Sequence, residues 1–460
     1  MCGCEHGEPK LADLQSPQGT IMRNILRVFS LFLLTLLSVT SFANDTDYGD
    51  RNGDEVRTAA RDIRHVFVIV LENKSFNNTF SLSTGATSAG QDPYLQQTLV
   101  PQGALLTEYF GTGHVSLDNY ISMISGQSPT PDTVDDCIPG LVGQGEYIDV
   151  QQTGIAPFHQ VIAGTGCVYP AHVKTLPDQL SDRDLTWKAY MEDMGNDPAR
   201  ESATCGHPTL GGPDLTNSAE APSSAVPAGD AYATRHDPFV YFHRIIDSHE
   251  CQTHVVALTP KTLPEDLRSI RTTPNYVFIT PNLCNDGHDG DGTGTGTKCA
   301  NGGPGGLTSA DAFLKTWVPL ITGSPAFKRD GLLIITFDES NFTQTVARVG
   351  NQTQVTLTFN GESCCNQEVG PNISGDRPTN LVLVNSPTLL EQFAINGIGG
   401  DQVGALLLSP FIKPGSTSSV PYNHYSMLRS LEDIFRLDEH LGYAAQPNST
   451  IGNDTAIFKR

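Results

Sequence analysis

The chain has 460 residues, of which 38% are hydrophobic, so it is long enough to bury the core of one large α/β domain or two ordinary ones. Its formal net charge of −22 argues against nucleic acid as a partner, because a polyanion would be repelled over most of the surface. With only 28 Lys and Arg residues, any phosphate site needs local positive charge, and a bound metal ion is one source of it.

The first 43 residues have the pattern of a signal peptide. A basic stretch after Met22 leads into an apolar run that ends in Ser41-Phe42-Ala43, which resembles a cleavage site. The apolar run is shorter than the roughly 20 residues of a spanning helix, so an uncleaved anchor is the weaker alternative. Met22 is an alternative start, because residues 1–21 carry no targeting pattern. We expect a secreted or periplasmic protein with no stable membrane span after cleavage and a polar segment at 44–60.

Export makes the cysteines candidates for disulfides rather than for metal ligands. Those that follow the predicted cleavage site are even in number, which is consistent with up to four disulfides whose pairing the sequence leaves open. Cys284 and Cys299 bracket a glycine-rich loop, so they are the pair we expect first. The set comprises Cys137, Cys167, Cys205, Cys251, Cys284, Cys299, Cys364 and Cys365.

Four short apolar runs, each followed by polar or acidic residues, predict buried strands. They cover residues 65–71, 276–280, 332–336 and 405–408. Runs that are apolar throughout are typical of strands buried on both faces, as in a parallel sheet. Helical patterns lie between them, around 311–320 and 427–435, which predicts a doubly wound α/β catalytic domain at 61–442 with a C-terminal tail at 443–460. Residues 196–235 and 340–378 are predicted to be surface insertions.

Residues 113–120 place a histidine, a hydroxyl and an amide at the predicted start of a helix. Ser116 lies near the N-cap of this helix, and capping is by itself the commonest role of a serine there. The functional alternative is a hydroxyl nucleophile, because a helix N-terminus favours a bound phosphate. The helix is indicated by an apolar stripe that ends at Gly126 and comprises Leu117, Tyr120, Ile121 and Ile124.

Acidic and amide side chains follow two of the predicted strands. Glu72 and Asn73 come after the first strand, and Asp338 and Glu339 come after the third. Because ligands of open α/β sheets bind beyond the carboxyl ends of the strands, we expect these side chains at one edge, where their oxygens suit a divalent cation. The structural alternatives are a capping turn at Glu72-Asn73 and a solvent-exposed strand end at Asp338-Glu339.

A glycine-rich loop carries Asp286, His288, Asp289 and Asp291. One interpretation is a calcium loop, although the spacing departs from the EF-hand pattern. A second makes His288 a phosphate donor or leaving-group acid, and a third is a solvated loop. His424 precedes the helix predicted at 427–435, and most histidines in such a position are structural.

Five motifs, in this order, resemble the secreted phosphoesterase family of bacterial acid phosphatases and phospholipases C, within the alkaline phosphatase superfamily. They are residues 70–76, 113–127, 281–289, 335–340 and 423–429. The resemblance implies an alkaline-phosphatase-like α/β/α sandwich with a mostly parallel central sheet and long loop insertions. It also implies metal-assisted double displacement at a phosphate ester. Asn77 and the acidic pair Asp338-Glu339 depart from the commonest family pattern.

The resemblance also implies roles for individual residues. Ser116 would be the nucleophile, and Asn119 would be an oxyanion donor. One or more divalent metal ions would be bound by Glu72, Asn73, Ser116, Asp338 and Glu339. The transferring phosphoryl group would be contacted by His114, His288 and His424, one of which would protonate the leaving oxygen. Asp286 is a further candidate for binding substrate.

We therefore expect an exported acid phosphatase that hydrolyses phosphate monoesters through a phosphoserine intermediate. Its substrates would be small phosphate esters or lipid headgroups, with phosphoinositide headgroups as one class. The first alternative is a phospholipase C or another phosphodiesterase that uses the same site. The second is a non-enzymatic secreted protein that binds calcium through residues 286–291.

Overall fold

The computed structural model describes residues 60, 62–80, 90–138, 147–373, 379–447 and 449–459. The predicted signal peptide lies outside the described residues, and so does the segment 44–60 except for its last residue. Within the described ranges, no helix combines the length and the apolar character that a membrane crossing requires.

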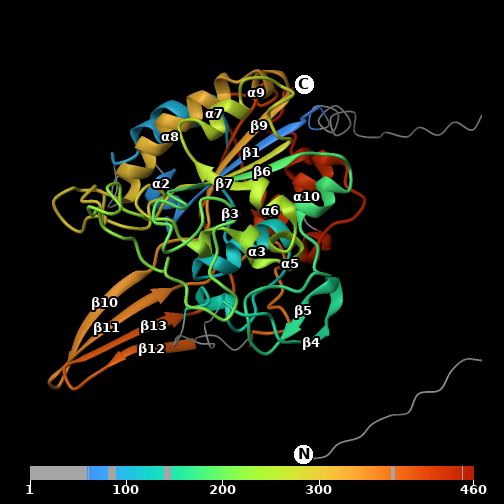
Figure 1. Cartoon of the computed structure of the whole chain (residues 1–460). Coiled ribbons are helices and arrows are strands. Elements are labelled where there is room, and N and C mark those ends of the chain that lie inside the picture. The colour runs from blue at the N-terminus through green and yellow to red at the C-terminus, as the bar shows by residue number, and fades with distance from the viewer. Residues whose placement is uncertain are drawn as a thin grey trace, which may run out of the picture. The chain divides into compact units, whose positions relative to one another are not determined.

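An eight-stranded sheet forms the core of the described chain (Figure 1). Its strands are β1 (His65–Leu71), β2 (Ala104–Leu106), β6 (Trp187–Glu192), β7 (Val255–Leu258), β8 (Tyr276–Thr280), β9 (Gly331–Phe337), β14 (Ala405–Leu408) and β15 (Ser416–Ser418). They lie in the order β15-β2-β14-β9-β1-β8-β6-β7. Every neighbouring pair is parallel except the two pairs that include β14. The expected α/β class with a mostly parallel sheet is therefore confirmed.

The four predicted strands appear as β1, β8, β9 and β14, with bounds within one residue of those expected. Every residue of β1 and β9 is buried, and the two strands pair in parallel from His65 opposite Gly331 to Leu71 opposite Phe337. β14 differs from the parallel direction that its apolar run suggests. Because β14 lies between two other strands, its sequence is apolar whichever way it runs.

Helices cover both faces of this sheet. They are α2 (Phe76–Thr79), α3 (Ser116–Ser125), α4 (Leu176–Ser181), α5 (His243–Ile246), α6 (His249–His254), α7 (Thr262–Asp266), α8 (Gly306–Gly323), α9 (Pro325–Asp330) and α10 (His424–Phe435). Figure 1 shows α8 and α9 on one side of the sheet, with α3 and α10 on the other. α3 ends as predicted at Gly126, whose φ of 66° allows the left-handed C-cap that glycine favours. The helices predicted at 311–320 and 427–435 lie within α8 and α10.

Smaller sheets occupy the connecting segments. β3 (Tyr109–Phe110) pairs with β16 (Tyr422–Asn423), and β4 (Gln152–Ile155) pairs with β5 (Val161–Ala163). A four-stranded sheet has the order β10-β11-β13-β12 and comprises β10 (Thr343–Val349), β11 (Gln352–Phe359), β12 (Thr379–Asn385) and β13 (Leu389–Ile395). The segment 340–378, predicted to be a surface insertion, contains β10 and β11, and every residue of β10 is exposed. Their many Thr and Gln residues gave no hydrophobic period that predicts a strand.

Four disulfides join the eight cysteines of the described chain. Cys284 pairs with Cys299, as expected from the glycine-rich loop between them. The other pairs are Cys137–Cys167, Cys205–Cys251 and the adjacent Cys364–Cys365.

Candidate active site

Glu72 and Ser116 meet at the carboxyl end of β1. Glu72 directly follows the strand, and Ser116 is the first residue of α3. The Ser116 hydroxyl donates a hydrogen bond of 2.9 Å to Glu72 Oε2, while the Tyr120 hydroxyl donates to Glu72 Oε1. Both Glu72 and Ser116 are buried. The serine hydroxyl thus bonds a carboxylate from another element instead of an amide of its own helix, so it is not simply a helix cap.

The start of α3 is held by two carboxylates. Val115, at the N-cap, has a φ of 77°, which a β-branched residue rarely adopts. Its N–H donates to Glu339 Oε2 at 3.1 Å, and the N–H of Leu117 donates to Asp136 Oδ1 at 2.7 Å. The backbone on either side of Ser116 is therefore fixed by side chains that come from different parts of the chain.

Asn119 holds the loop that precedes Ser116. Its Oδ1 accepts from the N–H groups of Thr112 at 2.7 Å and Gly113 at 3.1 Å, and its Nδ2 donates to the Gly113 carbonyl at 3.1 Å. Asn119 is fully buried. These bonds give the side chain a role in positioning the loop, and its expected role as an oxyanion donor stays a prediction.

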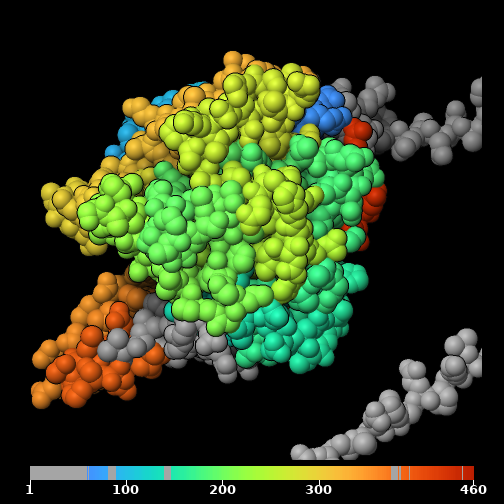
Figure 2. Space-filling model, viewed as in Figure 1, coloured from blue at the N-terminus to red at the C-terminus, as the bar shows by residue number. Residues whose placement is uncertain are grey.

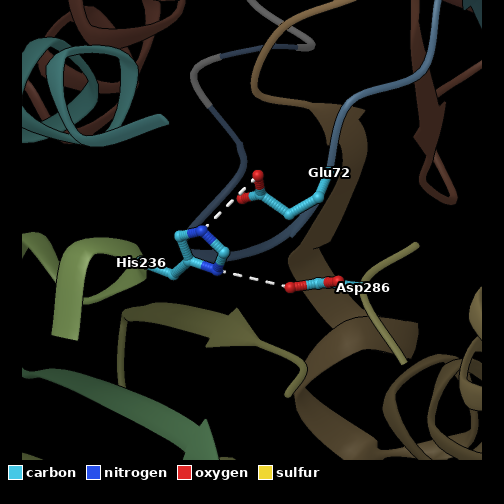
Figure 3. Close-up of side chains that lie close together, drawn as sticks. All are labelled: Glu72, His236 and Asp286. Atoms are coloured by element: carbon cyan, nitrogen blue, oxygen red, sulfur yellow. Dashed lines mark ion pairs between the residues drawn. The ribbon is translucent and has the colours of Figure 1, made fainter. Parts of the chain in front are cut away.

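Glu72, His236 and Asp286 form a compact buried group. His236 Nε2 lies 3.5 Å from Glu72 Oε2, and Nδ1 lies 3.3 Å from Asp286 Oδ2. Figure 3 shows the imidazole lying between the two carboxylates. One ligand atom from each residue lies within 4.8 Å of the others, a spacing that a metal ion could bridge. The His236 ring also stacks on Tyr120, with 5.3 Å between centroids.

His236 is a site residue that the sequence analysis missed. It ends the turn Thr234–His236, directly after the segment at 196–235 predicted to be an insertion. Figure 2 shows this green part of the chain spread over the visible face, yet His236 itself is 1% exposed. The available signal was the run Arg235-His236-Asp237, in which three charged or titratable residues follow a stretch rich in small residues.

Asp338, directly after β9, lies beside the residues that follow β1. Its Oδ1 accepts from the N–H of Asn73 at 3.0 Å, and its buried Oδ2 has no hydrogen-bond partner among the described residues. His424, at the start of α10, has Nε2 2.6 Å from the Asp338 carbonyl oxygen and Nδ1 3.1 Å from the Tyr109 hydroxyl. Burial lowers the pKa of His424 to about 4, so the ring is neutral. The structure therefore brings Asn73 and Asp338, which were expected at one edge of the sheet, together with His424, whose expected contact with the phosphoryl group stays a prediction.

Glu339, the other acid after β9, pairs with His114. Its Oε2 contacts His114 Nδ1, while Asp401 Oδ2 lies 3.5 Å from His114 Nε2. Burial lowers the pKa of His114, but the charges and hydrogen bonds of Glu339 and Asp401 raise it by more, to about 9. His114 is therefore an imidazolium between two carboxylates, and Glu339 lies with it rather than in the group of Glu72 and His236.

The acids of the glycine-rich loop point to different partners. Asp286 faces His236, and its Oδ1 also accepts from the His288 N–H at 2.7 Å. Asp289 Oδ1 lies 2.8 Å from His288 Nδ1, and Asp291 Oδ1 accepts from the Thr293 N–H at 2.9 Å. The rings of His288 and His236 have centroids 6.0 Å apart, so this loop brings Asp286 and His288 to the buried group.

The buried carboxylates need more positive charge than the nearby side chains supply. Burial and then the charges of Asp338 and Asp286 raise the pKa of Glu72 well above its usual range. Burial, with the charge of Glu339, raises the pKa of Asp338 to about 8. Asp286 Oδ2 and Asp338 Oδ2 are buried without a hydrogen-bond donor among the described residues. Carboxylate oxygens and an imidazole nitrogen left in this state fit a divalent metal ion.

Comparison with known proteins identifies the family. The model of the Phosphoesterase family matches residues 84–438. The chain belongs to the phosphoesterase family. This finding confirms the family resemblance; four of the five motifs lie within the matched residues, and residues 70–76 precede them.

The chain is also similar to curated relatives and to solved structures. The chain is 26% identical over 266 residues to a phosphate-repressible acid phosphatase from Penicillium chrysogenum, covering 58% of this chain and 48% of that protein. It is 22% identical over 241 residues to an acid phosphatase from Aspergillus fumigatus, covering 52% and 39% respectively. The chain thus spans about half the length of the curated relatives it matches. The structure is similar, with a TM-score of 0.41 and 10% sequence identity, to that of a protein in the alkaline phosphatase superfamily from Vibrio parahaemolyticus. The similarity covers 87% of this chain and 79% of that chain.

Proposed function

We propose that this protein is a phosphatase that hydrolyses phosphate monoesters, with Ser116 as the nucleophile. The observation that carries the proposal is the hydrogen bond from Ser116 Oγ to Glu72 Oε2 at the first residue of α3. A helix N-terminus attracts phosphate through its dipole, so a phosphoryl group bound there would meet the hydroxyl directly. The names of the fungal relatives support acid phosphatase activity over other chemistry.

The residues best suited to hold a divalent metal ion are Glu72, His236, Asp286 and Asp338, with Asn73 and Ser116 as further ligands expected from the motifs. When bound, such an ion lowers the pKa of the serine hydroxyl and offsets the charge of the phosphate oxygens. For Glu339, the contacts with His114 and Val115 favour a positioning role instead.

The reaction proceeds in two displacements. Ser116 Oγ gives its proton to Glu72 Oε2, its hydrogen-bond partner, and forms a bond to phosphorus as the bond to the leaving oxygen breaks, while His288 gives that oxygen a proton. Water then attacks the phosphoserine and gives one proton to His288. The Ser116 Oγ–P bond breaks as Glu72 returns the proton to Ser116, which releases inorganic phosphate. His288 is placed for the role of acid because its side chain is 34% exposed at the rim of the buried group. Since burial lowers its pKa, the ring carries the proton that it donates only at acid pH. Small phosphate esters and phosphoinositide headgroups are the substrate classes that we propose, and the signal-like sequence at 1–43 favours an exported enzyme.

The test compares substitutions at the two ends of α3. Ser116→Ala should lower the turnover of p-nitrophenyl phosphate by several orders of magnitude, by analogy with the removal of other nucleophiles. Ser125→Ala is the matched control, because that hydroxyl donates to the Ile121 carbonyl and accepts from the Gln127 N–H at the far end of the helix, away from Glu72. Full activity in Ser116→Ala would refute the proposal.

The same assay separates the alternative functions. Bis-p-nitrophenyl phosphate and phosphatidylcholine report diesterase and phospholipase C activity at the same site. A strong preference for the lipid would replace the monoesterase proposal with the phospholipase C alternative.

A further inference from the structure

Arg235 is a buried cation next to the candidate active site. It is 4% exposed and precedes His236 in the same turn. Its Nε lies 3.3 Å from Asp136 Oδ2, and its Nη1 donates to the Asn217 carbonyl at 3.2 Å. A guanidinium has five N–H donors, and Nη2 has no hydrogen-bond partner among the described residues. Arg235 is thus anchored on one side and keeps donors for a ligand.

Asp136 links this arginine to the nucleophile. Its other oxygen, Oδ1, accepts from the N–H of Leu117, the residue after Ser116. One carboxylate therefore bonds both Arg235 and the first turn of α3. Arg235 is also close to the histidines of the site. Burial is the main cause that lowers the pKa of His236 and His288, and the charge of Arg235 lowers both further.

The other cations near Ser116 keep fewer hydrogen-bond donors than Arg235 does. Lys74 Nζ donates to the carbonyls of Gly287 at 2.6 Å and Glu72 at 3.4 Å. His114 lies between Glu339 and Asp401. In the part of the chain that the structure describes, Arg235 is therefore the cation near α3 that is best placed to add a bond to phosphate.

We propose that Arg235 binds a non-bridging oxygen of the phosphoryl group and selects monoesters over diesters, an inference that rests on the proposed function. A monoester is a dianion with three non-bridging oxygens, whereas a diester is a monoanion with two. The planar guanidinium pairs with phosphate oxygens and gains more from the dianion. The anchor on Asp136 fixes the arginine before substrate arrives, so little side-chain entropy is lost on binding.

The test measures kcat/KM for p-nitrophenyl phosphate and for bis-p-nitrophenyl phosphate in Arg235→Gln and Arg235→Lys. Loss of a hydrogen bond to a charged group should lower the monoester value by roughly 10- to 100-fold in Arg235→Gln. The diester value should fall much less, so the ratio of the two shifts toward the diester. Arg235→Lys keeps the charge but not the fork of donors, and it should shift the ratio in the same direction by a smaller factor.

Asp136→Asn is the control for a purely positioning role. It keeps an acceptor for the Leu117 N–H and removes the ion pair with Arg235. If Arg235 acts only through Asp136, all three variants will lower the two kcat/KM values by equal factors, and that result would overturn the inference.

Calorimetric binding of inorganic phosphate provides a readout that does not depend on turnover. The affinity for phosphate should fall in Arg235→Gln and Arg235→Lys, whereas unchanged affinity in both would refute the inference. Wild-type protein that binds phosphate through Arg235 but hydrolyses no ester would refute the proposed function alone. Thermal unfolding shows whether Arg235→Gln is folded. If it is not, the ratio of the monoester to the diester kcat/KM is taken from Arg235→Lys, which can still pair with Asp136.

Discussion

The Ser116 hydroxyl donates a hydrogen bond of 2.9 Å to Glu72, a residue 44 positions earlier in the chain. This bond joins the start of α3 to the end of β1, and β1 pairs along its whole length with β9, which is followed by Asp338. Ser116, Glu72 and Asp338 are therefore held together at the carboxyl ends of two paired strands. Such positioning is what a catalytic site needs in order to hold its groups ready for reaction.

Glu72→Gln should abolish most phosphatase activity and reduce bound metal. Glutamine keeps an acceptor for the Ser116 hydroxyl but removes the negative charge that a divalent ion requires. Metal content per chain, measured by elemental analysis of the purified protein, should fall together with activity. Glu265→Gln is the control, because that exposed glutamate on α7 only pairs with Arg268. Unchanged metal content in Glu72→Gln would exclude Glu72 as a ligand.

His236→Asn tests the residue that the sequence analysis missed. Removing the imidazole between Glu72 and Asp286 should weaken metal retention during dialysis against a chelator, and activity should be lost sooner than in the wild type. His249→Asn, at an exposed position at the start of α6, should behave like the wild type. Equal retention in all three proteins would show that His236 serves only to pack against Tyr120.

Val115→Gly should separate stability from activity. Glycine adopts the φ of 77° without steric cost, so the free energy of unfolding should rise or stay level. The turn before Ser116 becomes more flexible, and kcat should fall. The free energy of unfolding, from denaturant titration, and kcat are measured on the same preparations of Val115→Gly and the wild type. A variant that is clearly less stable, or one that is as active as the wild type, would contradict a functional reason for this conformation.

Glu432, on the buried side of α10, should make the protein less stable as the pH rises. Its Oε1 accepts from the Leu441 N–H at 2.8 Å, and burial, with the charge of Asp433, raises its pKa from 4.5 to about 9. Between these values the unfolded chain has lost the proton that the folded chain keeps. Folding then takes up a proton, so stability present below pH 4.5 is lost progressively as the pH rises toward 9.

Glu432→Gln removes this titration. The free energy of unfolding in urea should therefore fall less between acid and alkaline pH than in the wild type. The difference between the two proteins should grow as the pH rises. Parallel pH profiles for the variant and the wild type would show that Glu432 is not the group responsible.

The sequence predicted the elements that are buried on every side. β1, β8 and β9 are apolar throughout because each is covered by neighbouring strands and by helices, so composition alone revealed them. α3 was predicted from its apolar stripe and Gly126. Glu72, Asn73 and Asp338 could be placed at one edge because the ends of parallel strands meet there.

Residues whose role depends on tertiary contacts could not be predicted in this way. His236 contacts Glu72 and Asp286, which are distant in sequence, only through the tertiary fold. No hydrophobic periodicity in the preceding segment 196–235 predicts that contact. Asp136 and Arg235 are far apart in sequence but meet beside α3. β10 and β11 are polar strands held by each other and by β13, so no hydrophobic pattern marked them.

The most direct test of the central claim is to trap the phosphorylated enzyme. Wild-type protein and Ser116→Ala are mixed with a phosphate monoester, quenched in acid within the first turnovers, digested, and analysed by peptide mass spectrometry. The account predicts one phosphoryl group on Ser116 of the wild type and none on the matching peptide of Ser116→Ala. Turnover by the wild type with the phosphoryl group on another residue, or continued turnover by Ser116→Ala, would contradict it.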